Sequence, residues 1–365
     1  MRHHAPEDGL TSGLTSGWPG GHDGGVRVVV VDPNLPLVAA ELEAALAAAV
    51  PGSTVAWYPR FDAAAVAVDL RDAEVLVASR YTAALAPHSG ALRLLQCPAA
   101  GVDGLDLAAL PAGVGVARTG HHELAVAEHV LAGVVALRRR LREQDDALRG
   151  TGTWASPTYD ASLPLPIGLA GARVGFVGFG AIGGACWRAF EALGALGAAV
   201  TGSGRVAPGS GLGWSGRTDG SDGAGGLDRL VSESDVLVLC APLVPATKGL
   251  LDARVLALAP RGAVVVNVAR GPLADEDALF KALAGGHLGG AVLDVWWSYP
   301  RGSAAGTTAV GAPGRRDWAS LGGRVLASPH SSAVTRQVLL ARVADVAENA
   351  RRALAGEALL NPVPR

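Results

Sequence analysis

The chain has 365 residues, of which 49% are hydrophobic and 18% charged, and its formal net charge is -2. This length is typical of about two domains, and the composition excludes a mostly disordered chain. The near-neutral charge also excludes the basic surface that sequence-independent nucleic-acid binding requires. No uninterrupted apolar run reaches the roughly 18 residues of a membrane-spanning helix, so no membrane partner is expected.

Residues 1–25 are rich in Gly, Ser, His and Pro and carry no signal-peptide pattern, so we expect a disordered tail there. The three cysteines (Cys97, Cys186 and Cys240) are far apart, each beside or inside an apolar run. This spacing indicates neither a disulfide framework nor a metal knuckle. We therefore expect buried free thiols, no metal site and a cytoplasmic location.

Short apolar runs predict two series of strands that alternate with helices. The first series has strands at 26–31, 55–58, 74–77 and 92–96 and a helix over 37–49, without a Gly-rich phosphate fingerprint. The second has strands at 174–178, 198–201, 236–240, 263–268 and 291–295, and an amphipathic closing helix over 334–355. Such alternation predicts an α/β fold with parallel sheets. Gly-rich stretches at 202–226 and 301–323 are read as loops, the latter as a surface insertion.

Residues 124–137, where the first series gives way to the second, are apolar on nearly every side. Glu128 and His129 are the only charged or titratable residues in this stretch. A helix without a polar face must be covered on several sides. It therefore fits a helix that crosses between domains, or one that also forms a subunit interface, and we expect a homodimer through this part of the chain.

A glycine pattern follows the strand at 174–178 and opens a helix. Gly178, Gly180 and Gly183 form GxGxxG, with Ala181 and Ile182 between the last two glycines. Glycines at these places allow a tight turn, close approach of the backbone to a pyrophosphate, and close helix–strand packing. The helix N-terminus then offers free N–H groups to the phosphates. The alternative is a Gly-rich turn in a plain α/β domain.

The segment after the next strand bears on the choice of cofactor. An acidic residue about 20 positions after the glycines would accept from the adenine ribose 2′-hydroxyl. No carboxylate lies between Glu191 and Asp219, whereas Ser203 and Arg205 follow the strand. A hydroxyl and a guanidinium suit a 2′-phosphate. We expect NADP(H) to be preferred, with NAD(H) possible; the alternative is that Arg205 is a solvated loop charge.

Four further motifs stand in a fixed order along the chain. They are Ala-Ala-Gly-Val-Asp at 99–103 with Asp106, Ala-Val-Ala-Glu-His at 125–129, Asn-Val-Ala-Arg-Gly at 267–271, and Ser-Pro-His at 328–330. This ordered set resembles the D-isomer-specific 2-hydroxyacid dehydrogenase family, which includes phosphoglycerate, glyoxylate/hydroxypyruvate and formate dehydrogenases. The resemblance implies two Rossmann-like domains with a cleft between them: a flavodoxin-like substrate domain of 26–118 and 331–365, and an NAD(P)-binding domain of 119–330.

The resemblance also implies roles for single residues. The loop with Ala100 and Gly101 would hold the substrate carboxylate through its backbone N–H groups, and Arg270 would bind the carboxylate and polarise the carbonyl. His330 would be the acid and base. Asp294 would bind the nicotinamide carboxamide. Further cofactor contacts are expected at Pro242, Thr247, Ala269 and Ser332.

Two positions depart from the family pattern. Tyr299 stands where many members have a glutamate that pairs with the catalytic histidine. A neutral partner cannot stabilise imidazolium by charge, so His330 should protonate at lower pH than in a His–Glu pair, although Tyr299 can still orient the ring by a hydrogen bond. His122 stands where many relatives have asparagine; a substrate contact, helix capping and core packing are all open for it.

The sequence thus predicts an NAD(P)-dependent oxidoreductase that interconverts a small 2-keto acid and its D-2-hydroxy acid. One alternative is a formate-dehydrogenase-like oxidation, suggested by the missing acid and weakened by His122. The other is a redox sensor that binds the dinucleotide with little turnover, against which Arg270 and His330 argue. The sequence does not identify the substrate.

Overall fold

The computed structural model describes residues 25–300 and 312–365. The chain divides into two compact units, one formed by residues up to Gly120 together with Leu339–Arg365, the other by His121–Val338. Their boundaries lie at 120/121 and 338/339, whereas 118/119 and 330/331 were expected. The expected N-terminal tail, and residues 301–311 of the expected insertion, fall outside the described residues.

The first unit is built on a sheet of five parallel strands in the order β2-β1-β3-β4-β5. This is the flavodoxin-like order. Its strands are short apolar runs because a parallel sheet is covered on both faces. The strands are β1 (Arg27–Val31), β2 (Thr54–Tyr58), β3 (Val75–Ala78), β4 (Leu94–Cys97) and β5 (Gly115–Arg118).

Three α-helices cover this sheet: α1 (Ala39–Ala49), α2 (Ala63–Leu70) and α9 (Arg336–Ala355). The helix expected over 37–49 is preceded by a 3-10 turn, Leu35–Val38, in which Pro36 lies near the start. The closing helix α9 begins at Arg336 and joins the core beside β1 and α1. The Asn349 side chain of α9 donates to the Gln96 side chain of β4 at 2.7 Å, and both residues are fully buried.

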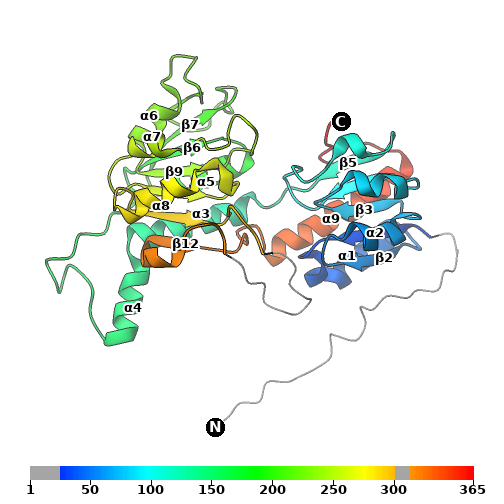
Figure 1. Ribbon diagram of the computed structural model, residues 1–365, viewed down its shortest axis with the longest axis horizontal. Coiled ribbons are helices and arrows are strands. Elements are labelled where there is room, and N and C mark those ends of the chain that lie inside the picture. Colours follow the sequence, from blue (N-terminus) through cyan, green and yellow to red (C-terminus); the bar gives the residue numbers. More distant parts are fainter. Residues whose placement is uncertain (1–24, 301–311) are drawn as a thin grey trace, which may run out of the picture. The chain divides into compact units, whose positions relative to one another are not determined.

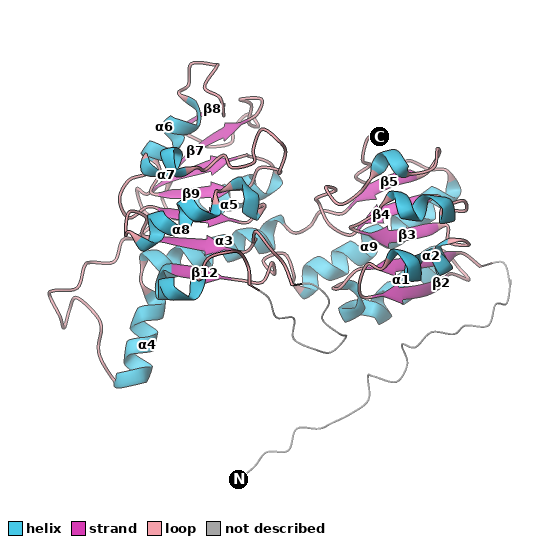
Figure 2. Cartoon of the chain, viewed as in Figure 1, coloured by secondary structure: helices cyan, strands magenta, loops and turns pink. Residues whose placement is uncertain are grey.

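The described residues of the second unit form seven parallel strands in the order β12-β11-β10-β9-β6-β7-β8. Strands β8, β7, β6, β9, β10 and β11 reproduce the doubly wound 3-2-1-4-5-6 order, and the sheet extends by β12 (Figure 2). The order reverses between β6 and β9, which is where such sheets bind dinucleotides. The strands are β6 (Arg173–Val177), β7 (Leu196–Thr201), β8 (Trp214–Arg217), β9 (Val236–Leu239), β10 (Val264–Asn267), β11 (Gly290–Leu293) and β12 (Val325–Ala327).

Two apolar clusters of the second unit lie on opposite faces of this sheet, one under α3 and α5 and the other under α6, α7 and α8. The helices are α3 (Glu123–Arg138), α4 (Leu141–Thr151), α5 (Ala181–Glu191), α6 (Gly226–Glu233), α7 (Ala253–Ala257) and α8 (Glu276–Ala284). The doubly wound arrangement confirms the predicted α/β class. No helix among the described residues is long and apolar enough to span a membrane.

Two Gly-rich stretches differ from the expected loops. The stretch 202–226 contains β8, which pairs with β7 from Ala198 to Thr201. The described part of 301–323 is not only surface: Trp318 is 7% exposed and stacks on Trp297 with ring centroids 5.3 Å apart. Glycine content hid both features, because a short edge strand and a single buried tryptophan change the local pattern little.

Candidate dinucleotide and catalytic site

The glycine loop joins β6 to α5 at the carboxyl edge of the second sheet. Gly178 has φ of 85°, and a Cβ there would lie 2.8 Å from the Ala241 backbone, so the turn requires glycine. Gly180 precedes α5 without a side-chain cap, and a Cβ there would meet nothing within 4 Å. The first turn, which contains Ala181, Ile182 and Gly183, therefore has backbone N–H groups that no side chain caps. This arrangement fits a pyrophosphate.

The loop after β7 carries the expected ribose-side residues. Ser203 and Arg205 are both exposed, and the Ser203 hydroxyl accepts from the Arg205 N–H at 3.3 Å. The end of β8 lies beside this loop, since a Cβ on Gly204 would lie 2.8 Å from Cγ of Arg217 and 3.1 Å from a carboxylate oxygen of Asp222. The segment between β8 and α6, here called the inserted turn, brings Asp222 to this loop, and β8 itself brings Arg217; sequence spacing indicated neither.

Arg217 is itself held in place by the inserted turn. Its guanidinium donates to Asp219 at 3.2 Å, and its backbone N–H donates to Asp222 at 2.5 Å. The Arg217 hydrogen bond, together with those from Ser221, holds the pKa of Asp219 well below its usual range. The edge of the ribose loop therefore presents arginine and aspartate side chains side by side.

Loops after β9 and β10 continue the same edge of the sheet. The Thr247 hydroxyl donates to the carbonyl of Pro242 at 2.7 Å and so closes the loop after β9. After β10, the fully buried Asn267 accepts from the Ala269 N–H at 3.1 Å and donates to the Arg270 carbonyl at 2.9 Å. These bonds fix the backbone on both sides of the Arg270 side chain, whose Nη1 donates to the Ala269 carbonyl at 2.8 Å.

The Arg270 loop lies against the segment that carries Tyr299. A Cβ on Gly271 would overlap the Trp296 backbone, so glycine allows the two segments to touch. The Tyr299 hydroxyl accepts from the Trp296 N–H at 3.2 Å and lies 3.2 Å from Nδ1 of His330. The structure thus brings the Arg270 loop and the Tyr299–His330 pair into one neighbourhood within the second unit.

Asp294 holds the loop on which His330 stands. Its carboxylate accepts from the Ser328 hydroxyl at 2.6 Å, from the Ser331 N–H at 2.8 Å, and from the N–H and hydroxyl of Ser332. Burial disfavours ionisation of this fully buried group, but these hydrogen bonds outweigh it and hold its pKa below the ordinary value. His330 has φ of 58°, a left-handed conformation that this anchoring supports. The contacts of Asp294 and Ser332 with cofactor stay predictions.

The remaining expected substrate residues are divided between the units. Ala100 and Gly101 follow β4 in the first unit, where the Cys97 thiol donates to the Gly101 carbonyl at 3.3 Å and Arg118 donates to the Ala100 carbonyl at 3.2 Å. His122 is the residue immediately before α3 in the second unit and makes no side-chain capping bond to that helix. The described residues contain no cluster of three or more potential metal ligands.

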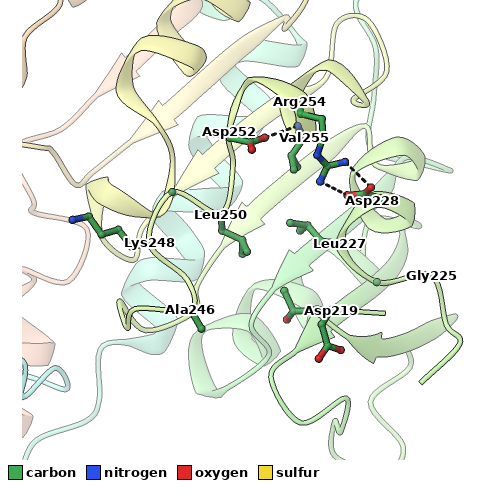
Figure 3. Close-up of a pocket in the computed structure, with 13 residues that line it drawn as sticks. Asp219, Gly225, Leu227, Asp228, Ala246, Lys248, Leu250, Asp252, Arg254 and Val255 are labelled. Carbon is green, nitrogen blue, oxygen red and sulfur yellow. Dashed lines mark hydrogen bonds and ion pairs between the residues drawn. The ribbon is translucent and has the colours of Figure 1, made fainter. Parts of the chain in front are cut away.

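A separate cavity of about 540 Å³ lies between the loop after β8 and the segment from β9 to α7 (Figure 3). Its wall includes Asp219, Leu250 and the ion pair of Arg254 with Asp228, in which the closest atoms are 2.7 Å apart. Ala246 and Lys248, the neighbours of Thr247, also line it. None of the expected catalytic residues borders this cavity.

A glycine loop at the switch point of a doubly wound sheet, with an arginine loop and an anchored histidine along the same edge, defines a dinucleotide-binding α/β protein of the oxidoreductase type. Comparison with known families is more specific. Residues 131–331 match the family model of the D-isomer specific 2-hydroxyacid dehydrogenase, NAD binding domain, and the chain belongs to this family. The resemblance inferred from the motifs is thereby confirmed.

Individual relatives are dehydrogenases and reductases. The chain is 34% identical to a glycerate dehydrogenase of Methylorubrum extorquens over 56% of its own length and 60% of the relative. It is 32% identical to D-3-phosphoglycerate dehydrogenase of Mycobacterium tuberculosis over 78% of its length but 48% of the relative. The structure resembles an NADPH-dependent glyoxylate/hydroxypyruvate reductase of Sinorhizobium meliloti, with 25% identity, a TM-score of 0.72, and coverage of 93% and 97% of the two chains. The chain spans less than two thirds of these two curated relatives.

Proposed function

We propose that this protein is an NAD(P)-dependent dehydrogenase that interconverts a small 2-keto acid and its D-2-hydroxy acid. The observation that carries the proposal is that one edge of the second sheet brings three features together. It holds an open glycine loop, the fixed Arg270 loop and the Tyr299–His330 pair. Membership in the 2-hydroxyacid dehydrogenase family supports the same reaction.

Each residue has a distinct task in this proposal. The N–H groups of Gly180–Gly183 bind the cofactor pyrophosphate, and the bound nicotinamide supplies or accepts the hydride. Arg270 binds the substrate carboxylate and polarises the carbonyl with its forked guanidinium. His330 gives a proton to the carbonyl oxygen during reduction and removes it during oxidation. Tyr299 fixes the ring of His330 through Nδ1.

The proposal is tested by mixing purified protein with NADPH or NADH and a panel of 2-keto acids from glyoxylate and hydroxypyruvate to phenylpyruvate. Turnover that depends on the keto acid supports a dehydrogenase. Binding of both cofactors without oxidation of either would instead favour a redox-sensing protein. Formate oxidation without activity on any 2-keto acid would favour the formate-dehydrogenase-like alternative.

The cofactor preference that we propose is NADP(H). Ser203 and Arg205 are exposed on the loop after β7, and Arg217 lies beside them. Arginine forms strong charge-assisted hydrogen bonds to phosphate oxygens. Asp222, brought to the same loop by the inserted turn, opposes a 2′-phosphate, so the preference depends on Arg205 and Ser203 outweighing it.

Arg205→Ala is expected to raise KM for NADPH by roughly ten- to a hundredfold, because a charge-assisted bond to phosphate is lost, and to change KM for NADH little. Steady-state kinetics with both cofactors measures this. Arg261→Ala is the matched control, since Arg261 is exposed near the opposite ends of the strands, before β10. Equal losses with both cofactors would remove Arg205 from 2′-phosphate recognition.

We also propose a homodimer formed through the second unit. Helix α4 and the segment that follows it form an arm that projects from this unit (Figure 1). No residue of α4 is buried. The arm carries apolar side chains that are exposed, among them Trp154 at 63% and Leu165 at 80%. Exposed apolar side chains concentrated on one extended segment are typical of an interaction surface. A second copy of the chain is the partner that fits this reading.

Light scattering is expected to give twice the chain mass of 36.7 kDa for the parent protein. The double variant Trp154→Asp, Leu165→Asp should have the mass of one chain, because it places charges in the apolar contact. Val68→Asp, at an exposed apolar position of α2 in the first unit, should keep the parent mass. A parent of single-chain mass would contradict the dimer, and a dimeric double variant would exclude this arm as its interface.

A further inference from the structure

We propose that Glu276 is a positioning residue that holds Tyr299 against His330 by clamping the turn formed by residues 312–316. The inference depends on the proposed function only for the role of His330 as acid and base. Glu276, the first residue of α8, belongs to none of the motifs that predicted the site. The path from its carboxylate to His330 runs entirely through the second unit.

The carboxylate of Glu276 is buried, with the residue 3% exposed. One oxygen accepts from the backbone N–H groups of Arg315 and Arg316, the latter at 3.0 Å. The other lies 3.4 Å from Nε of Arg315. A buried carboxylate is costly unless it is paired and hydrogen-bonded. If the turn moved away from α8, the carboxylate would lose these hydrogen bonds. The turn and α8 are therefore fixed to each other.

Neighbouring groups strengthen the clamp. A Cβ on Gly314 would overlap the Glu276 carboxylate, so only glycine lets the turn approach this closely. Arg316 donates to Asp277 at 2.7 Å, which holds the pKa of Asp277 below its usual range. The guanidinium of Arg316 also lies over the ring of Phe280, 5.9 Å from its centre. The turn is therefore held against the first two turns of α8.

The turn of residues 312–316 is bonded to the segment that leads to Tyr299. The carbonyl of Pro313 accepts from the N–H groups of Trp297 at 3.2 Å and Ser298 at 3.1 Å. The Ser298 hydroxyl donates to the Ala312 carbonyl at 2.5 Å. The backbone of residues 297–298 is thus bonded to the turn. The Trp297 ring also donates to the Ala274 carbonyl at 2.9 Å, so the turn held by Glu276 is one of two attachments that set the position of this segment.

Tyr299 follows directly and meets His330. The side chain is 46% exposed, so burial alone does not fix it. Its hydroxyl is located by the Trp296 N–H and lies 3.2 Å from Nδ1 of His330. A displaced turn would move this hydroxyl and weaken its bond to the imidazole. Glu276 therefore acts on His330 through the turn and Tyr299, and we assign it no contact with substrate or cofactor.

The test is an NMR pH titration of the His330 ring in the full chain without substrate, with the signal identified by its loss in His330→Asn. Four proteins are compared: the parent, Glu276→Ala, Tyr299→Phe and the double variant. We expect Glu276→Ala to move the His330 midpoint in the same direction as Tyr299→Phe, by up to about half a pH unit. The double variant should show no further shift, because both changes break one path.

Two other variants separate this role from a general loss of structure. Gly314→Ala places a methyl group on the Glu276 carboxylate, so the carboxylate or the turn must move and the bonds between them are disturbed. It should therefore shift the midpoint in the same direction as Glu276→Ala, and it serves if the latter does not fold. Asp277→Ala removes a partly exposed flanking bond of the turn but leaves the Glu276 carboxylate in place, so its shift of the His330 midpoint should be smaller than that of Glu276→Ala. In turnover, Glu276→Ala should lower kcat by about the same factor as Tyr299→Phe, roughly fivefold, with KM for the cofactor unchanged.

An unchanged His330 midpoint in folded Glu276→Ala and Gly314→Ala would overturn the clamp, as would shifts that simply add in the double variant. The titration needs no substrate, so the two proposals fail separately. A shared shift in a protein without turnover would support the clamp and contradict the dehydrogenase. Turnover with no shift would do the reverse.

Discussion

Arg270→Ala is expected to lower kcat/KM for a 2-keto acid by roughly a thousandfold. The variant loses both the partner of the substrate carboxylate and the group that stabilises charge on the carbonyl oxygen, and loss of one such donor alone costs about 10²- to 10³-fold. The Asn267 bonds to the backbone on both sides remain, so the loop should keep its shape. Steady-state kinetics, with cofactor affinity measured by fluorescence quenching, separates substrate from cofactor effects.

Arg270→Lys is the matched variant for this prediction. It keeps the positive charge but not the planar fork that binds a carboxylate in two places. We expect it to recover only a small part of the lost kcat/KM. Activity of Arg270→Ala close to that of the parent would exclude Arg270 from substrate binding and from catalysis.

His330→Asn should lower kcat about 10²- to 10⁴-fold in both directions, because proton transfer in the transition state loses its acid and base. Asparagine is the appropriate replacement, since it tolerates the left-handed backbone at this position, where φ is 58°. Alanine would add backbone strain to the chemical loss. The affinity for cofactor should change little, which a direct binding measurement checks.

The pH dependence gives an independent check on His330. Reduction requires the protonated imidazole, so its rate should be constant at low pH and fall as pH rises through the pKa of the ring. Tyr299→Glu replaces the neutral hydroxyl that faces Nδ1 of His330 by a carboxylate on the same segment, which favours imidazolium and should move that fall upward by about one pH unit or more. The assignment of His330 as the acid would be contradicted if the pH–rate profile of Tyr299→Glu matched that of the parent. It would also be contradicted if the residual activity of His330→Asn kept the parent's pH–rate profile.

Motifs that lie within one loop could be predicted from the sequence. The glycines at 178–183 follow an apolar strand and begin a helix, so both the turn and the helix N-terminus could be placed before the structure was known. The order of apolar runs also predicted two parallel sheets. These features depend on neighbouring residues, and local physical chemistry is sufficient to indicate them.

Contacts between distant segments could not be predicted in this way. The Glu276 carboxylate meets backbone N–H groups 39 and 40 residues further along the chain. On the sequence alone, a glutamate in the first turn of a helix indicates only a favourable interaction with the helix dipole. Asp222 is similar: it belongs to a Gly-rich turn in sequence, but β8 returns it to the ribose loop. The pairing of Tyr299 with His330 was an expectation from family resemblance, not from spacing.

The placement of α9 in the first unit has a consequence for synthesis on the ribosome. The hydrogen-bond partner of Gln96, Asn349, lies 253 residues further along the chain. The apolar core beside α1 and β1 is likewise completed by residues of α9, such as Val346. The N-terminal sheet therefore emerges with part of its core uncovered, while the whole second unit is translated and has the chance to fold first. The core of the second unit can therefore be complete before that of the first unit. A nascent first unit would expose apolar surface, to which chaperones can bind, until α9 leaves the exit tunnel.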